Sequence, residues 1–153
     1  MHDQNFLIRE SRSVHLNTPV FSIFIPTWNN LSYLKLCIDS LRRHSVLPLQ
    51  IIVHINEGND GTTAWVKSQT DLSFTFSQEN IGVCYSLNQC RTLAHGDYFL
   101  YLNDDMYVCP GWDQYLYNEI KAIGHDAFFL SATATCGFTT FSFILRRFHT
   151  FYG

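Results

Sequence analysis

Residues 97–105 read Asp-Tyr-Phe-Leu-Tyr-Leu-Asn-Asp-Asp, an apolar run that ends in three polar residues. The run is too short for a buried helix, and its aromatic and aliphatic side chains are typical of a strand. Ligands of open α/β sheets bind just beyond the carboxyl ends of the strands, where Asn103, Asp104 and Asp105 stand. Such oxygen ligands suit Mg²⁺ or Mn²⁺, which commonly bridge protein carboxylates to substrate phosphates. A solvated turn is the alternative interpretation, because Asn and Asp are also common in turns.

The composition indicates one globular domain. The chain has 153 residues, of which 46% are hydrophobic and 15% charged, enough apolar material for a core. A formal net charge of −3 gives no electrostatic footprint for nucleic acid. We expect no transmembrane segment, because no apolar run is long enough to cross a bilayer. Five cysteines without a Cys-x-x-Cys pair predict reduced thiols and a cytoplasmic protein, with peripheral attachment to a membrane as the alternative.

Short apolar runs alternate along the chain with stretches of helical period. This alternation predicts an α/β fold, with a mostly parallel sheet flanked by helices and with the loops gathered at one edge. The polar loops at 26–30, 55–61 and 103–105 are then expected to meet at that edge. We expect strands at residues 20–25, 49–55, 72–76, 98–102 and 127–130, and helices at about 31–44, 62–69, 83–94 and 112–120.

Individual residues carry local expectations. Pro26 should end the first strand, since proline cannot donate to a ladder, and Gly96 should end the third helix as its C-terminal cap. His54 lies inside a strand and is expected to be a hydrogen-bonded core or edge histidine. Trp28 and Trp112 are interpreted as packing residues rather than as stacking platforms for a ligand.

Four segments together resemble the family 2 glycosyltransferases, and the match covers residues 20 to 133 in the expected order. The resemblance implies a GT-A fold, in other words a Rossmann-like, mostly parallel sheet, here apparently truncated to the nucleotide-sugar-binding half. Residues 21–29 resemble the first strand and its Pro-Thr-Tyr-Asn loop, with Trp in place of Tyr. Residues 51–62 resemble the second strand and its acidic loop, in which the usual Asp is displaced. Residues 80–82 resemble the Asn-x-Gly helix start, and residues 103–105 resemble the Asp-x-Asp motif with Asn in the first place.

The same resemblance implies a site for a nucleotide-diphosphate sugar. Asp104 would face the ribose or diphosphate, and Asp105 would chelate Mg²⁺ or Mn²⁺, which neutralises the diphosphate leaving group as a Lewis acid. The alternatives are a simple turn and helix cap for Thr27 and Asn29, and a solvated surface carboxylate for Glu57. Either Asn29 or Asn30 could cap the helix that follows. The residues that the resemblance places in the donor site are Thr27, Asn29, Glu57, Asn103 and Asp104.

A general base is not apparent from the sequence. The acids after Asp105 are Asp113, Glu119 and Asp126, all in or beside the next expected helix, so none of them is a convincing base for an inverting transferase. The resemblance implies a nucleotide-sugar-binding domain at 20–133, which follows a polar lead-in at 1–19 and precedes a phenylalanine-rich tail at 134–153. The atypical tail suggests a truncated or frame-shifted gene product.

Two functions of different classes follow. The first is a metal-dependent, inverting glycosyltransferase that moves a sugar from a nucleotide-diphosphate sugar to an unknown acceptor, which is a glycan, a lipid or a protein. The second is a non-catalytic remnant that binds the nucleotide sugar without turnover. An α/β nucleotide-binding domain of another family is a third possibility, weakened because the chain lacks the glycine-rich phosphate loops of those families.

Overall fold

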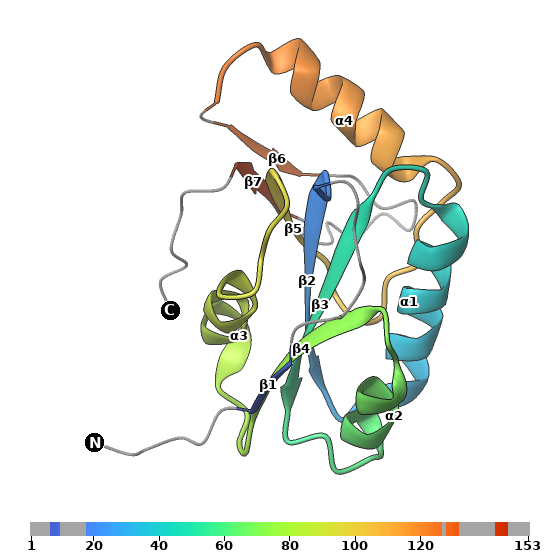
Figure 1. Ribbon diagram of the computed structural model, residues 1–153, viewed down its shortest axis with the longest axis vertical. Helices are drawn as coiled ribbons and strands as arrows, with labels where there is room; N and C mark the ends of the chain where they lie inside the picture. The colour runs from blue at the N-terminus through green and yellow to red at the C-terminus, as the bar shows by residue number, and fades with distance from the viewer. Residues whose placement is uncertain (1–6, 10–17, 127, 132–142, 147–153) are drawn as a thin grey trace.

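The computed structural model describes residues 7–9, 18–126, 128–131 and 143–146 (Figure 1). Strands and helices alternate through most of this part of the chain, as expected from the sequence. The strands are β1 (Leu7–Arg9), β2 (Phe21–Trp28), β3 (Leu49–Asn56), β4 (Leu72–Ser77), β5 (Tyr98–Tyr101), β6 (Phe129–Ser131) and β7 (Phe143–Arg146). The helices are α1 (Leu31–His44), α2 (Thr62–Ser68), α3 (Gly82–Arg91) and α4 (Trp112–Ile123).

The strands form one mixed sheet in the order β1-β4-β3-β2-β5-β7-β6. Its centre consists of β4, β3, β2 and β5, which pair in parallel. β1 is added antiparallel to β4, and β7 pairs antiparallel with both β5 and β6. The predicted α/β class with a mostly parallel sheet is confirmed.

Helices cover both faces of the sheet, with α1 and α2 on one side and α3 on the other (Figure 1). The position of β2 between these two layers of helices explains why its sequence is almost continuously apolar. Phe21, Ile23 and Ile25 belong to the core under α1, α2 and α4, whereas Phe24 belongs to the core under α3. Because side chains alternate across a strand that is buried on both faces, both positions of the alternation must be apolar.

Pro26 does not end β2, so this expectation is wrong. The strand continues to Trp28 and pairs with β3 as far as Asn56. The Leu102 N–H donates to the Phe24 carbonyl, so the backbone groups of Phe24 point toward β5. Successive residues of a strand point their backbone groups to its two neighbouring strands in turn, so residues 24 and 26 point the same way. Pro26 therefore faces the β5 side too, where the ladder with β5 has already ended, and its missing N–H leaves no bond unmade.

Gly96 does not cap α3. The helix ends at Arg91, and the residue after it, Thr92, has a right-handed helical backbone conformation. Gly96 instead packs against β2. A Cβ atom placed there would lie 2.6 Å from the Ser22 backbone nitrogen, and the Gly96 N–H donates to the Ser22 hydroxyl at 2.9 Å. A glycine signal that looked like a helix end therefore marks a close approach of two backbones.

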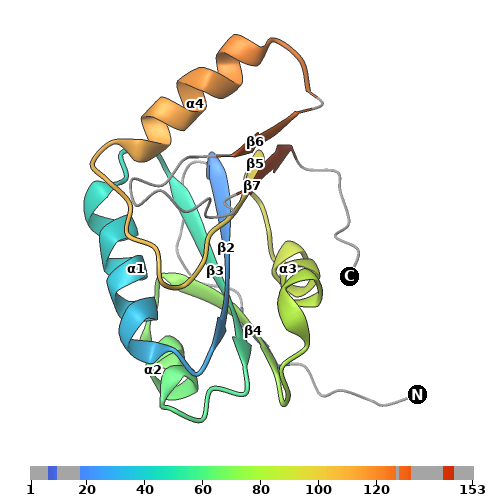
Figure 2. The same ribbon diagram turned by 180° about the vertical axis from the view of Figure 1, so that it is seen from behind.

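The segment after β5 leads to α4 along the side of α1 (Figure 2). α4 is held at its start, because the Trp112 ring packs 6.1 Å from Phe21 and its indole N–H donates to the Ser45 hydroxyl at 3.0 Å. The buried carboxylate of Asp113 accepts the N–H groups of Val46 and Leu47 at 2.8 and 2.7 Å. The packing interpretation of Trp112 is confirmed. Asp113 has a structural role, since its carboxylate holds the backbone that follows α1.

Both end segments contribute to the sheet. β1 lies within the predicted lead-in and β7 within the predicted tail, so each segment adds a strand. The domain limits at 19 and 133 stay a prediction. Within the described ranges, no helix is both long and apolar enough to cross a membrane.

Candidate functional site

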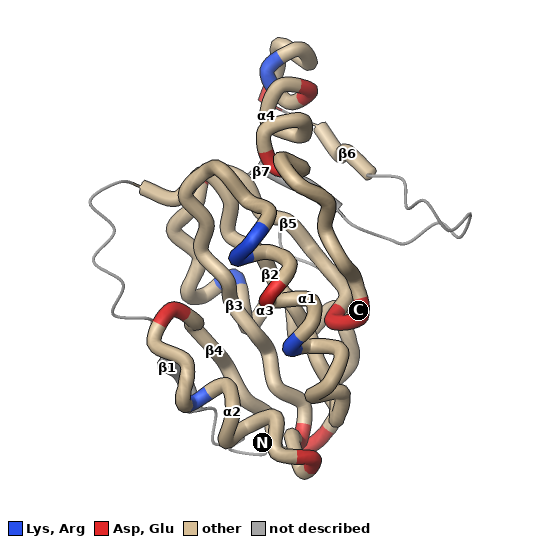
Figure 3. The backbone as a smooth tube through the Cα atoms, turned by 90° about the vertical axis from the view of Figure 1, so that its right-hand side faces the viewer, with Lys and Arg blue, Asp and Glu red and all other residues tan. Residues whose placement is uncertain are grey.

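The three polar loops meet at the carboxyl ends of the parallel strands, as the sequence predicts. The Thr27 hydroxyl, at the end of β2, donates to the Asp104 carboxylate beyond β5 at 2.6 Å. The Asn29 amide donates to the Glu57 carboxylate beyond β3 at 3.2 Å. Figure 3 shows several acidic positions (red) together at the end of the tube opposite α4. Parallel pairing brings these groups together, although up to 77 residues separate them in the chain.

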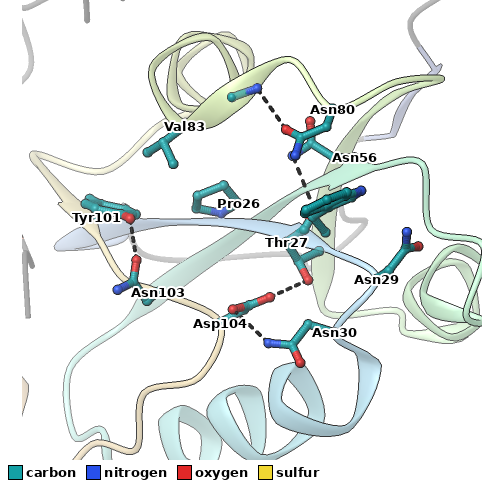
Figure 4. Close-up of a pocket in the computed structure, with 12 residues that line it drawn as sticks. Pro26, Thr27, Asn29, Asn30, Asn56, Asn80, Val83, Tyr101, Asn103 and Asp104 are labelled. Atoms are coloured by element: carbon teal, nitrogen blue, oxygen red, sulfur yellow. Dashed lines mark hydrogen bonds between the residues drawn. The ribbon is translucent and has the colours of Figure 1, made fainter.

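A pocket of about 400 Å³ opens between these loops (Figure 4). Four of the six predicted site residues line it, while Glu57 reaches it only through Asn29, and Asp105 is an exposed neighbour of Asp104. The pocket wall is rich in amides, which both donate and accept hydrogen bonds. The lining residues are Pro26, Thr27, Trp28, Asn29, Asn30, Asn56, Asn80, Gly82, Val83, Tyr101, Asn103 and Asp104.

Asp104 is the polar centre of the pocket. Its two carboxylate oxygens accept one bond each, from Thr27 and from the Asn30 amide at 3.1 Å. Partial burial raises the pKa of Asp104, the neighbouring charge of Asp105 raises it further, and the two hydrogen bonds oppose the shift. A cation beside the two carboxylates would stabilise their charged forms, and it would thereby oppose both the effect of burial and the repulsion between the two charges.

The negative potential of this acidic pair reaches two neighbouring groups. Burial, followed by the charges of Asp104 and Asp105, raises the pKa of Cys37 to about 12. The pKa of Tyr101 is raised by the same causes in the same order. Cys37 and Tyr101 both hold Asn103, through its carbonyl at 3.6 Å and through its side-chain oxygen, respectively. Two side chains therefore hold the first residue of the polar segment 103–105 in place.

At this edge the described part of the chain offers a divalent metal two neighbouring carboxylates, those of Asp104 and Asp105. Within the described residues, no three His, Cys, Asp or Glu side chains gather into a metal site. Mg²⁺ usually keeps several waters and is held by one or two carboxylates together with substrate phosphates. The exposed carboxylate of Asp105 beside Asp104 matches this arrangement, in which a phosphate-bearing ligand completes the coordination.

Asn29 and Glu57 both adopt left-handed backbone conformations, with φ of 49° and 61°. Asn tolerates this region, but Glu is strained in it. The Asn29 side chain compensates by joining the two loops: it donates to Glu57 and accepts the Asn59 N–H at 2.8 Å. Glu57 is therefore hydrogen-bonded to Asn29 at the pocket edge, and its place in a donor site stays a prediction.

The helix cap expected at Asn29 or Asn30 has a different arrangement. Asn30 occupies the N-cap position of α1, but its side chain makes no capping bond. The Asp60 carboxylate accepts the Leu31 N–H at 2.8 Å instead. Asn30 is thus free to bind Asp104, a role that sequence reasoning missed because local sequence gives no sign of a partner 74 residues away.

Two expectations about single side chains have opposite outcomes. His54 is fully buried and hydrogen-bonded to Thr75 and Ser77, so its assignment to the core is confirmed. Trp28 is 56% exposed at the pocket, so the packing interpretation is wrong for this residue. Its place directly after Thr27, at the carboxyl end of a strand, was the signal available in the sequence.

The sequence profile described as Glycosyl transferase family 2 matches residues 22–152. Curated relatives are similar over shorter stretches. An uncharacterized glycosyltransferase of Rickettsia typhi is 35% identical over 92 residues, which cover 59% of this chain and 29% of the relative. The hyaluronan synthase of Pasteurella multocida is 29% identical over 101 residues, which cover 63% of this chain and 10% of the relative. Among the curated relatives found, this chain spans 10% to 33% of their length.

Solved structures confirm the GT-A fold. Residues 1–349 of Staphylococcus aureus TarS, in complex with UDP-GlcNAc, superpose with a TM-score of 0.65 at 20% identity, covering 78% of this chain and 36% of TarS. The mannosyltransferase PcManGT from Pyrobaculum calidifontis, in complex with GDP-Man and Mn²⁺, gives a TM-score of 0.61 at 22% identity, covering 77% and 36%. At these identities the likeness concerns the fold, whereas the profile match extends over most of the sequence. The chain belongs to glycosyl transferase family 2.

Proposed function

We propose that this chain is the donor-binding part of a metal-dependent glycosyltransferase. Such an enzyme transfers a sugar from a nucleotide-diphosphate sugar to a glycan, lipid or protein acceptor with inversion. The observation that carries the proposal is the hydrogen-bonded group of Thr27, Asp104 and Asn30 at the pocket, with the exposed carboxylate of Asp105 beside it. The pocket, at about 400 Å³, has the size of a small-molecule site.

The chain's own residues bind and orient the donor in this proposal. Asp105, assisted by Asp104, would hold Mg²⁺ or Mn²⁺, and the bound metal would supply the Lewis acid that neutralises the diphosphate leaving group. Thr27 and Asn29, with Glu57 behind Asn29, form the side of the pocket assigned to the nucleoside. Asn103 is held by Tyr101 and Cys37, so the acidic pair is placed before the donor arrives.

Binding without transfer is the second candidate function, and one observation favours it. Among the described residues, no carboxylate after Asp105 lines the pocket. Asp113 is fully buried and holds two backbone N–H groups, while Glu119 and Asp126 are exposed on α4 and just after it. Transfer with inversion needs a base at the acceptor hydroxyl, and this part of the chain does not place one there.

Calorimetry tests the proposal directly. UDP, GDP, UDP-GlcNAc and GDP-mannose are titrated into the protein with and without Mn²⁺. We expect at least one nucleotide to bind more tightly with Mn²⁺, and Asp105→Ala to abolish this metal dependence. Glu119→Ala is the matched control, because it removes the same charge from an exposed helix position and should bind as the wild-type protein does.

Two outcomes discriminate among the functions. Metal-dependent binding without release of free nucleotide from the sugar donors indicates a binding remnant, whereas release of UDP or GDP indicates catalysis. If no nucleotide binds under any of these conditions, the donor-site proposal is refuted.

A further inference from the structure

The Asn56 side chain lies at the floor of the pocket, where β3 ends, and is only 3% exposed. Its amide nitrogen donates to the Thr27 carbonyl and to the Ser86 hydroxyl, both at 3.3 Å. Its oxygen accepts the Ile81 N–H at 3.0 Å and the Ser77 hydroxyl at 3.3 Å. The two backbone partners fix the orientation of the amide, because a carbonyl can only accept and an N–H can only donate.

These four bonds join separate walls of the pocket, and Figure 4 shows the one from Asn56 to Thr27. Thr27 belongs to the end of β2, whereas Ile81 belongs to the loop before α3 and Ser86 to α3 itself. Asn80 and Gly82, on either side of Ile81, line the pocket opposite Thr27. Asn56 is therefore one of the groups that hold this wall relative to β2, together with the apolar packing of Leu87 and Cys90 of α3 against Phe24.

A second set of bonds anchors Asn56 to the middle of the sheet. The Ser77 hydroxyl shares its single proton between the Glu79 carbonyl at 2.7 Å and the more distant Asn56 oxygen at 3.3 Å. Its own oxygen therefore accepts from His54 Nε2–H at 3.1 Å. His54 Nδ1 then accepts from the Thr75 hydroxyl at 2.7 Å. A continuous chain of neutral hydrogen bonds thus runs from the sheet interior to the pocket floor.

We propose that Asn56 is a positioning residue that sets the separation of the β2 wall and the α3 wall, and through it the affinity for the nucleotide. The inference rests on the proposed function, that the pocket binds a nucleotide donor. All hydrogen-bonding positions of the amide are occupied within the protein, so Asn56 acts through Thr27 and the residues around Ile81. A carboxylate in its place could not donate to Thr27 or Ser86. Its oxygen would instead be repelled by the Thr27 carbonyl, so the side chain would have to move and would no longer hold the Ile81 N–H.

Gln50 provides a matched control in the same strand. It is 5% exposed; its nitrogen donates to the Leu93 carbonyl at 2.8 Å, and its oxygen accepts from the Ser22 hydroxyl and the His95 N–H at 2.7 and 2.9 Å. It lies six residues before Asn56, roughly 20 Å away along the strand. Gln50→Glu therefore makes the same chemical change in a buried, satisfied amide at the far end of the sheet.

The test compares Asn56→Asp with Gln50→Glu by two measurements, at a temperature where thermal melts show both variants folded. The first is the dissociation constant of UDP and GDP with Mn²⁺. The second is hydrogen exchange at the Ile81 amide, which Asn56 holds and which needs no ligand. Because one hydrogen bond is worth about a factor of ten in an equilibrium constant, we expect Asn56→Asp to weaken nucleotide binding at least tenfold and to accelerate exchange at Ile81. Gln50→Glu should leave both unchanged.

Each other outcome decides against the proposal. Equal nucleotide affinity in the two variants, or unchanged exchange at Ile81 in Asn56→Asp, overturns it. Should Asn56→Asp fail to fold, Ser86→Ala is the milder variant, since it removes one acceptor of the amide and should move both measurements in the same direction. If the wild-type protein binds neither nucleotide, the proposed function fails, and exchange at Ile81 alone decides whether Asn56 holds the loop.

Discussion

The buried His54 makes the stability of the protein sensitive to mild acid. Its ring is 0% exposed, and burial lowers its pKa from 6.5 to about 4, because the charged form is poorly solvated there. The unfolded chain takes up a proton near pH 6.5, whereas the folded chain does so only near pH 4. Between these values the unfolded state holds more protons, so stability is complete above pH 6.5 and is lost as the pH falls.

The size of the effect follows from the two pKa values. One pKa unit corresponds to about 1.4 kcal/mol. At pH 5 the unfolded His54 is almost fully protonated and the folded one remains neutral, so acidification from pH 7 to pH 5 should lower the free energy of unfolding by about 2 kcal/mol through this residue alone.

Urea denaturation at pH 7 and pH 5 measures this loss, with tryptophan fluorescence as the signal. Other groups also titrate in this range, so the matched variant is His54→Gln, which keeps one donor and one acceptor but has no proton to gain. The loss between pH 7 and pH 5 should be smaller by about 2 kcal/mol in the variant. An equal loss in the two proteins would refute the reasoning.

Three further predictions concern packing, structure and reactivity. Gly96→Ala should destabilise the fold by about 1–3 kcal/mol in urea denaturation, because its Cβ would meet the Ser22 backbone; wild-type stability would contradict the close approach. Asp113→Ala leaves two backbone N–H groups without their acceptor and should cost at least about 2 kcal/mol, while nucleotide affinity measured by calorimetry stays unchanged. In the native protein a thiol reagent should modify the exposed Cys109 and spare Cys37, whose pKa is raised to about 12; peptide mapping that finds both modified at similar rates would argue against the burial of Cys37.

Local patterns in the sequence determined most of the architecture. The alternation of apolar runs with helical periods predicted the order of the elements and the parallel centre of the sheet. Parallel pairing then required the loops that carry Thr27, Glu57 and Asp104 to meet at one edge. These predictions succeeded because strand and helix periods reflect burial, which the sequence records residue by residue.

Tertiary structure alone decided which side chains pair within the site. Asn30 looked like a helix cap and binds Asp104 instead, while Asn56 joins two walls of the pocket. Pro26 remains inside a strand because the neighbouring ladder has ended there. Hydrogen-bond partners depend on which segments meet in space, and segments 25 to 77 residues apart meet only when the whole sheet has formed. The sequence by itself therefore determined at which edge of the sheet the site lies. Contacts between segments far apart in the chain decided which side chains are hydrogen-bonded to one another there.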